Sequence, residues 1–251
     1  MYAPVFILIA FSFNESKSRV VWSGFTLKWY IKLFNDGEIL KAVLNTFIIA
    51  IFASLFATIL GVIGVVALKR VKSSTKSFIV NITNLPMVNP EIVTGVSLML
   101  LFVFSYNSLK ILKPGILTLI LSHTVFCVPY VMLSVLPKFN QLNPYLYEAA
   151  QDLGCPPIKA FFKVIFPDIF PGIITGFIMA FTLSLDDFVI SYFNSGTIQT
   201  LPIAIYSMTR KIVSPEINAL STILFLAVLI LLILINIRQS KDLNESGEKY
   251  N

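Results

Sequence analysis

Three acidic residues lie inside long apolar stretches of this 251-residue sequence, namely Glu91, Asp186 and Asp187. An aspartate at the centre of a membrane helix costs roughly 2.5–3.5 kcal/mol on insertion scales, so such residues are usually retained for a function. Asp186 and Asp187 are consecutive, and consecutive side chains of a helix point about 100° apart. We therefore expect one aspartate to face a polar pathway and the other to pair or cap within the bundle.

These acids are suited to contact a cation that has lost part of its hydration, because an anionic group stabilises a nearby positive charge. Aromatic ring faces also attract ammonium groups, and Trp29, Tyr30 and Tyr206 are the candidates near the outer surface. The alternative for the acids is structural pairing with Ser, Thr or Asn of neighbouring helices. The alternative for the aromatic residues, which we favour, is anchoring at the membrane interface, where Tyr and Trp collect.

Other kinds of site have less support in the sequence. His123 is the single histidine and lies among apolar residues, so we expect a packed or hydrogen-bonded side chain rather than a proton carrier. Cys127 and Cys155 indicate neither a disulfide framework nor a metal site. No GxxxxGK(S/T) loop for ATP phosphates occurs. An intramembrane protease stays open as an alternative if Glu91 supplies a second carboxylate, since adjacent aspartates cannot face each other.

The elements that must position these residues are membrane helices. Apolar residues make up 56% of the chain and charged residues 13%, against about 25% charged residues in an average soluble domain. Stretches of about 20 apolar residues can span a bilayer as helices. The stretches that qualify are Ile39–Leu68, Phe78–Phe104, Gly115–Leu136, Ile169–Phe193 and Ala219–Ile237. A sixth, Tyr2–Phe13, would reach only about 18 Å, against a hydrocarbon core of about 30 Å.

We therefore predict an all-α integral membrane protein in which residues 1–251 form one transmembrane domain, a six-helix bundle with an apparently truncated first helix. For Tyr2–Phe13 we expect an upstream extension that supplies basic residues and further apolar length. The net charge is +6, but the basic residues form no patch with interleaved aromatic residues. The expected partner is accordingly a lipid bilayer and not nucleic acid.

Basic residues in the loops indicate the orientation. Lys69, Arg70, Lys72 and Lys76 follow the second stretch, and cytoplasmic loops carry an excess of Lys and Arg. Placing this cluster in the cytoplasm puts the N-terminus, the C-terminus and the loop of residues 137–168 on the same side.

The loop 137–168 encodes two short helices joined by a tight turn. Asn143 provides an N-cap for a helix Pro144–Leu153, and Gly154 can take the left-handed conformation that ends it. A second helix is expected from Pro156 to Phe166, ended by Pro167. The apolar residues of this second helix either pack beneath the bundle or form a docking surface for a soluble partner.

The same loop resembles the EAA loop of bacterial ABC-importer permeases. The matching residues are Glu148-Ala149-Ala150, Gly154, Val164 and Phe166-Pro167, and the family pattern prefers Ile and Leu at positions 164 and 166. The resemblance implies that the loop fits into a groove of a cytoplasmic ATPase and couples it to the permease. The candidates for this coupling are Glu148, Ala149, Ala150, Asp152, Gly154, Phe162 and Pro167. We call residues 144–167 the EAA segment.

The resemblance extends over nearly the whole chain, to the PotC-type subunits of the spermidine/putrescine permease family. It is carried by GFTLKWY, NPEIVTGVSLMLLF, SHTVFCVPYV, FTLSLDDFVIS and LPIAIYSM, which begin at residues 24, 89, 122, 181 and 201. It implies a permease subunit of an ATP-driven polyamine importer in the bacterial plasma (inner) membrane. The implied partners are a PotB-like second permease, a PotA-like ATPase dimer that binds ATP and Mg²⁺, and an external PotD-like polyamine-binding protein.

The resemblance also implies that this chain binds no cofactor itself and is not an enzyme. The acids Glu91, Asp186 and Asp187 then become candidates for the polyamine pathway, together with the three aromatic residues. Two alternatives remain: an ABC permease for another small cationic or organic solute, and, with less support, a membrane-embedded enzyme. The short first stretch departs from the family, whose members have a full first span.

Overall fold

Helices account for nearly all of the regular structure. The computed structural model describes residues 3–16, 21–68, 71–210 and 216–248, and within them the only β pairing is an isolated bridge between Asn14 and Phe25. Tyr2, Lys69 and Arg70 lie outside the described residues. The helices are α1 (Ala3–Phe11), α2 (Lys28–Asn35), α3 (Gly37–Leu68), α4 (Ser73–Val88), α5 (Glu91–Leu109), α6 (Ile116–Asn140), α7 (Pro144–Asp152), α8 (Pro157–Ala160), the π-helical turn η1 (Phe161–Ile165), α9 (Phe166–Asp186), α10 (Val189–Asn194), α11 (Leu201–Arg210) and α12 (Glu216–Glu248).

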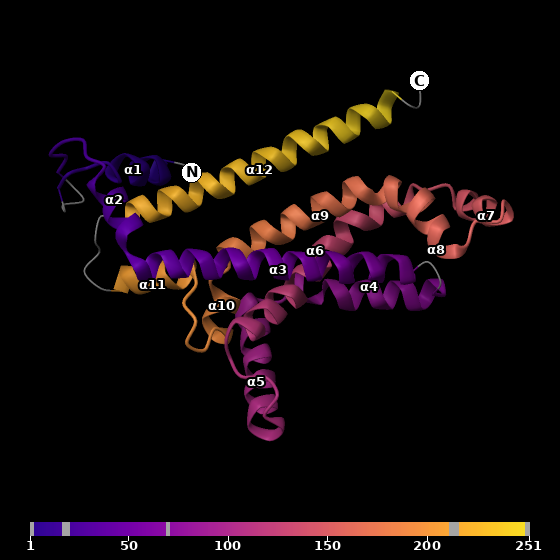
Figure 1. The fold of residues 1–251 in the computed structure, drawn as a ribbon, viewed down its shortest axis with the longest axis horizontal. Helices are drawn as coiled ribbons and strands as arrows, with labels where there is room; N and C mark the ends of the chain where they lie inside the picture. The colour runs from indigo at the N-terminus through magenta and orange to yellow at the C-terminus, as the bar shows by residue number, and fades with distance from the viewer. Residues whose placement is uncertain (1–2, 17–20, 69–70, 211–215, 249–251) are drawn as a thin grey trace.

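Four helical stretches of the described residues are long and apolar enough to cross a membrane. They are Gly37–Leu68, Glu91–Leu109, Ile116–Asn140 and the continuous run Pro157–Asp186. Figure 1 shows α3, α6 and α9 packed together, α12 along the outside, and α5 projecting sideways from the bundle. The centre of the molecule is therefore the contact among α3, α6 and α9.

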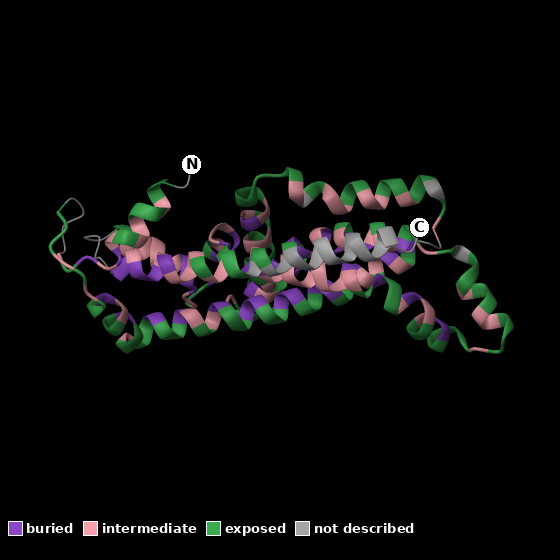
Figure 2. Ribbon diagram, turned by 90° about the horizontal axis from the view of Figure 1, so that it is seen from above, coloured by how far each residue is buried: buried purple, intermediate pink, exposed green. Residues whose placement is uncertain are grey.

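Small residues let these three helices approach closely. A Cβ atom at Gly61 of α3 would lie 2.7 Å from Cγ1 of Val131 in α6, and one at Gly172 of α9 would lie 2.9 Å from the carbonyl oxygen of Ser134. Membrane helices commonly pack through such small residues, because lipid gives little hydrophobic drive to associate. Figure 2 shows buried residues on the inner sides of the helices and exposed ones on their outer sides.

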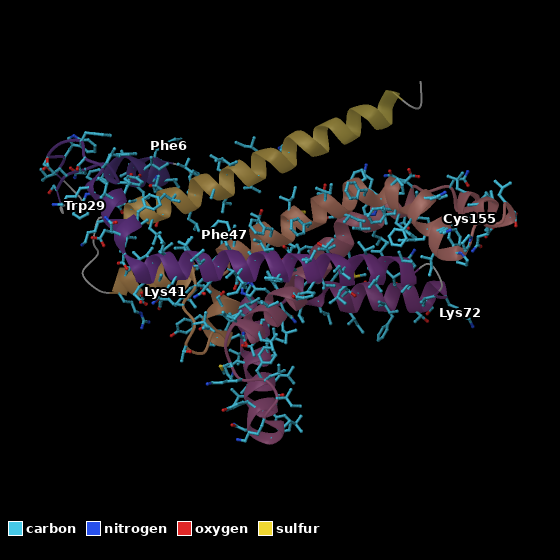
Figure 3. The ribbon with its side chains drawn as sticks, viewed as in Figure 1. Phe6, Trp29, Lys41, Phe47, Lys72 and Cys155 are labelled. Atoms are coloured by element: carbon cyan, nitrogen blue, oxygen red, sulfur yellow. The ribbon has the colours of Figure 1, made fainter. Side chains whose placement is uncertain are left out.

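The two ends of the bundle differ in content. α1, α2 and α11 lie at one end, which we call the α2 end, and the EAA segment lies at the other, which we call the EAA end (Figure 1). Lys72 and Cys155 both lie at the EAA end, whereas Trp29 and Lys41 lie at the α2 end (Figure 3). At the α2 end, Lys32 pairs with Glu216 at the start of α12, and this hydrogen bond raises the pKa of Lys32.

Most predicted segments correspond to single helices. α3 contains the stretch Ile39–Leu68, and α12 contains Ala219–Ile237. α1 lies within Tyr2–Phe13. α6 corresponds to Gly115–Leu136 but continues through Pro137 to Asn140.

Two predicted stretches are not single helices. Phe78–Phe104 contains α4 and α5, which are separated at Asn89-Pro90. Asn89 is extended (φ −74°, ψ 143°), as expected for a residue that precedes proline. Ile169–Phe193 contains most of α9 and the start of α10, which are separated at Asp187-Phe188. We call Asp187 and Phe188 the α9–α10 break, and both interruptions lie beside acidic residues of the candidate site.

Candidate functional site

The adjacent carboxylates at the end of α9 have different surroundings. The helix ends at Asp186, and Asp187 takes an extended conformation (φ −64°, ψ 118°) that redirects the chain into α10. The Asp187 carboxylate is buried and accepts backbone N–H groups from Ser191 at 2.9 Å and Ile190 at 3.4 Å. Asp186 is exposed. Asp187 therefore caps within the bundle and Asp186 faces outward, which is the division expected for consecutive acids.

His123 of α6 lies against the buried carboxylate. Its Nδ1 lies 2.7 Å from Oγ of Ser184 in α9, and its Nε2 lies 3.0 Å from Oγ of Ser191 in α10. The same Nε2 is 3.5 Å from Oδ2 of Asp187, and both side chains are almost fully buried. We call His123, Ser184, Asp187 and Ser191 the His123 cluster. The prediction of a hydrogen-bonded histidine agrees with this geometry.

Glu91 approaches the same region from α5. α5 packs on α10 at Gly95, whose carbonyl oxygen accepts from Asn194 Nδ2 at 3.1 Å. Glu91 is one turn earlier on the same face of α5 and is close enough to Asp186 to interact with it electrostatically. The stretch Phe78–Phe104 predicted one helix with Glu91 in its interior, and this was wrong. Asn89-Pro90 interrupts the helix, so Glu91 is the first residue of α5, where it is exposed.

Aromatic rings cluster immediately after the α9–α10 break. The ring of Phe188 lies 4.6 Å from that of Tyr206 in α11 and 5.4 Å from that of Tyr192 in α10, measured between centroids. Arg210 lies over the Tyr206 ring, with Cζ 4.9 Å from the centroid. Tyr206 therefore lies beside Phe188, two residues after Asp186, and one face of its ring already contacts a cation. Tyr192 and Phe188 were missed from the sequence, although both follow the Asp186-Asp187 pair closely.

Trp29 and Tyr30 do not join this group. Trp29 is buried, and its indole N–H donates to the backbone carbonyl of Asn14 at 2.7 Å. The Tyr30 hydroxyl is 2.7 Å from Oγ of Ser12, which follows α1. Both residues hold the chain before α2 onto the bundle at the α2 end. These hydrogen bonds favour a packing role for both side chains, and a place for Trp29 and Tyr30 in a cation pathway stays a prediction.

The end of α9 can attract a positive charge. Its last carbonyl groups have no intrahelical N–H partner, so a helix C-terminus carries a partial negative charge. Asp186 and Glu91 add two carboxylates, and neither forms an ion pair with a described residue. No group of His, Cys, Asp and Glu suited to a metal ion occurs among the residues that the structure describes. The arrangement can stabilise a mobile organic cation that passes the end of α9.

The EAA segment begins with a well-capped helix. The Asn143 side chain accepts the Tyr145 N–H at 3.0 Å, and Pro144 occupies the first turn of α7, as predicted. Gly154 has φ +82°, and its N–H donates to Gln151 O at 2.8 Å, while Cys155 N–H donates to Ala150 O at 3.1 Å. These two bonds form the Schellman arrangement that ends a helix at a left-handed residue.

The second helix of the EAA segment does not end at Pro167. α8, η1 and α9 form one continuous run from Pro157 to Asp186. At the end of η1 the Phe166 N–H donates to Phe161 O, five residues earlier. This spacing is that of a π-helical turn, one residue wider than in an α-helix. This turn directly precedes Pro167, whose ring would otherwise press on the carbonyl four residues earlier. The expected termination at Pro167 was wrong, and the run joins the EAA segment directly to the acidic site.

The EAA segment exposes apolar side chains. Leu153 is 90% exposed, Ile158 74% and Phe162 57%. Glu148 and Asp152 are also exposed and lie four residues apart on one face of α7. Ile165 and Ala160 are buried instead. One side of this helix therefore packs inward, as one reading expected, and the other side is left uncovered by the described residues. Its use as a docking surface stays a prediction.

Sequence comparison places these features among known proteins. The family described as "Binding-protein-dependent transport system inner membrane component" matches residues 57–239. The chain is 38% identical over 234 residues to the spermidine/putrescine transport system permease protein PotC of Escherichia coli K12, covering 93% of this chain and 87% of the relative. It is 42% identical over 232 residues to the putrescine transport system permease protein PotI of the same strain, covering 91% and 82%.

Structural comparison adds a likeness of fold. A chain of a bacterial alginate ABC transporter, solved with an alginate pentasaccharide-bound periplasmic protein, aligns with a TM-score of 0.72 and 18% identity, over 94% of this chain and 87% of that chain. A chain of the MetNI methionine ABC transporter in inward-facing form aligns with a TM-score of 0.63 and 18% identity, over 81% and 95%. At this identity the likeness concerns the fold alone.

Proposed function

This chain belongs to the family of binding-protein-dependent transport system inner membrane components, and from that premise we propose that it is the permease subunit of an ATP-driven importer of polyamines such as spermidine and putrescine. Members of the family are inner-membrane parts of ABC transporters, which work with an ATPase and a periplasmic binding protein. ATP is therefore hydrolysed by a partner, and this chain is a transport component without catalysis of its own.

The observation that carries the substrate class is the acidic site at the end of α9. Asp186 and Glu91 are exposed, near each other, and without an ion pair among the described residues. A polyamine carries several ammonium groups separated by methylene chains, so it gains from carboxylates and from nearby aromatic faces. Tyr192 and Tyr206 supply such faces beside the α9–α10 break. Asp187 contributes indirectly, because its carboxylate is occupied by backbone N–H groups.

The expected partners follow from the relatives. A PotB-like permease would supply the other wall of the pathway, a PotA-like ATPase dimer would bind the EAA segment, and a PotD-like protein would deliver the polyamine. The EAA end is then cytoplasmic, as is the end of α12, whereas α1 lies at the opposite end (Figure 1). The uncovered side chains Leu153, Ile158 and Phe162 fit this assignment, because exposed apolar groups at a cytoplasmic end need a protein partner.

Coupling between the ATPase and the pathway would use the run Pro157–Asp186. At 30 residues and about 1.5 Å per residue, this run extends about 45 Å from the EAA segment to the acidic site. The rings of Phe162, Phe166 and Phe170 follow one another along it in tilted contacts, with 5.6 and 5.5 Å between ring centroids. A displacement of the EAA segment on ATPase closure would therefore move the end of α9, where Asp186 lies.

The test is uptake of radiolabelled spermidine and putrescine into proteoliposomes that contain the complete complex. We expect ATP-dependent uptake that disappears when this chain is omitted and that unlabelled polyamines suppress. Labelled neutral solutes serve as the control and should not accumulate.

A permease for another small cationic or organic solute is the second candidate, because the fold also occurs in transporters of alginate and methionine. ATP-dependent uptake of such a solute, with no uptake of either polyamine, would replace the polyamine assignment. A membrane-embedded enzyme would instead act without the ATPase. Asp187 cannot serve as a second catalytic carboxylate facing Asp186, since the two side chains point to different surroundings.

A further inference from the structure

We propose that His123 is a positioning residue, which fixes the α9–α10 break and thereby the direction in which Asp186 faces. The proposal rests on the function proposed above, in which Asp186 contacts the cation. His123 itself is almost fully buried and touches no open space, so it is not placed to contact a solute. Its role would be exerted through Asp187.

The imidazole connects three helices at one point. His123 belongs to α6, Ser184 to the last turn of α9, and Ser191 to α10, so the ring contacts the chain on both sides of the break. These contacts bring together residues separated by 61 and 68 positions in the sequence. Backbone that is interrupted within a membrane must satisfy its polar groups internally. The His123 cluster provides those partners where the α9 helix stops.

The hydrogen-bond roles follow from the carboxylate. Asp187, when ionised, accepts only, and it lies 3.5 Å from Nε2. A neutral imidazole donates through one nitrogen and accepts through the other, so we place the proton on Nε2. Nδ1 then accepts the Ser184 hydroxyl at 2.7 Å. The Nε2 side thus holds Asp187 and Ser191 after the break, and the Nδ1 side holds Ser184 before it.

Fixing Asp187 also fixes its neighbour. Asp187 is tied to the first turn of α10 by two backbone N–H groups and to α6 by His123. Asp186 is the preceding residue, at the last position of α9, so the direction of its side chain depends on the backbone held at Asp187. If the contacts of His123 Nε2 are lost, α10 and the α9–α10 break can shift relative to α9. The exposed Asp186 carboxylate then loses its defined direction.

Two amide substitutions separate the two sides of the ring. The amide of His123→Gln reaches the position of Nε2, whereas that of His123→Asn reaches only the position of Nδ1. Both variants bury one neutral amide at the same position of the chain, so we expect similar general effects on folding. Ser122→Ala is the matched control, because Ser122 is equally buried but bonds only to Thr118 O within α6, at 2.7 Å.

The first readout is polyamine uptake per assembled complex. We expect His123→Gln and Ser122→Ala to stay within about twofold of wild type, and His123→Asn to fall about tenfold, within the range of coupling between contacting residues. If His123→Gln and His123→Asn give the same uptake rate per assembled complex, the positioning role is wrong.

The second readout does not depend on transport. Asp186→Cys, in a Cys155→Ser background, is labelled with a water-soluble thiol reagent that carries an ammonium group. We expect the labelling rate to be kept with His123→Gln and to fall about tenfold with His123→Asn. Equal rates in both variants would overturn the positioning role. If wild type carries no polyamine while the labelling rates differ, the proposed substrate fails and the positioning role stands.

Discussion

The two ends of the helical run Pro157–Asp186 show opposite exceptions to the usual burial of apolar side chains and exposure of polar ones. At the Pro157 end, Leu153, Ile158 and Phe162 are exposed although they are large and apolar. At the Asp186 end, polar side chains such as His123 and Asp187 are buried although they lie among membrane helices. The first end lacks a cover among the described residues, whereas at the second end the members of the His123 cluster hydrogen-bond to one another and to the backbone.

The two ends have different structural requirements. An exposed apolar surface in water gains free energy when a partner covers it, so the Pro157 end is suited to docking. A buried polar cluster is stable only when all its members are hydrogen-bonded, so the His123 cluster is suited to holding one fixed geometry. The run thus connects a surface that is open to a partner with a site whose shape is set internally.

The largest expected effect comes from Gly154→Leu, which acts on the docking end alone. Gly154 has φ +82°, and a Cβ there would meet no heavy atom within 4 Å, so any effect is one of backbone strain rather than crowding. A non-glycine residue in this conformation costs about 1–2 kcal/mol, which would shift α7 relative to α8. We expect polyamine uptake to fall below about one tenth of wild type, with weakened ATPase pull-down and normal membrane insertion.

Gly154→Asn is the matched control, because asparagine tolerates the left-handed conformation. It should retain most uptake and most ATPase binding. Wild-type pull-down and uptake with Gly154→Leu would mean that this turn does not set the docking surface.

A smaller effect is expected from Asp187→Ala, which acts on the buried end. The substitution leaves the backbone N–H groups of Ile190 and Ser191 without their acceptor and removes the carboxylate beside the His123 ring. An unsatisfied buried polar group costs about 1–3 kcal/mol. We expect less assembled complex in the membrane and a lower unfolding temperature, measured by size-exclusion chromatography after heating. An unchanged unfolding temperature would contradict the internal role assigned to Asp187.

The smallest effect is expected from Trp29→Phe, far from both ends of the run. A smaller aromatic ring replaces the buried indole, and the bond from Nε1 to Asn14 O is lost. The lost hydrogen bond costs about 1 kcal/mol of stability. Uptake per assembled complex should be unchanged, as it should for Trp22→Phe, whose ring is half exposed. A loss of polyamine uptake with Trp29→Phe alone would contradict a packing role and favour a place for Trp29 in the cation pathway.

Local sequence rules predicted the parts of the fold that depend on neighbours in the chain. The cap at Asn143, the left-handed turn at Gly154 and the long apolar helices follow from such rules, and the helical permease fold is confirmed by the family and structural likeness. The interruption at Asn89-Pro90 was visible as a proline within an apolar stretch. Its consequence for Glu91 was not drawn, because apolar length alone favoured one helix.

The site itself depended on contacts distant in sequence. Which of Asp186 and Asp187 is buried is decided by His123 and by the redirection of the chain into α10, and no local pattern carries that information. The continuity of the run through Pro167 was likewise unpredictable, since it relies on the π-helical turn η1. Both outcomes show tertiary packing deciding between local alternatives.

The most direct test of the account is the initial rate of polyamine uptake per assembled complex for Asp186→Asn, measured beside Gly154→Leu and Glu91→Gln. Asp186→Asn keeps the shape of the side chain and removes its charge, at the end of the run that faces the solute. We expect normal assembly and ATPase binding with uptake reduced about tenfold for Asp186→Asn, and a weaker reduction for Glu91→Gln. Unchanged uptake with both acid variants would contradict the account, because the cation would then pass without the carboxylates at the end of α9.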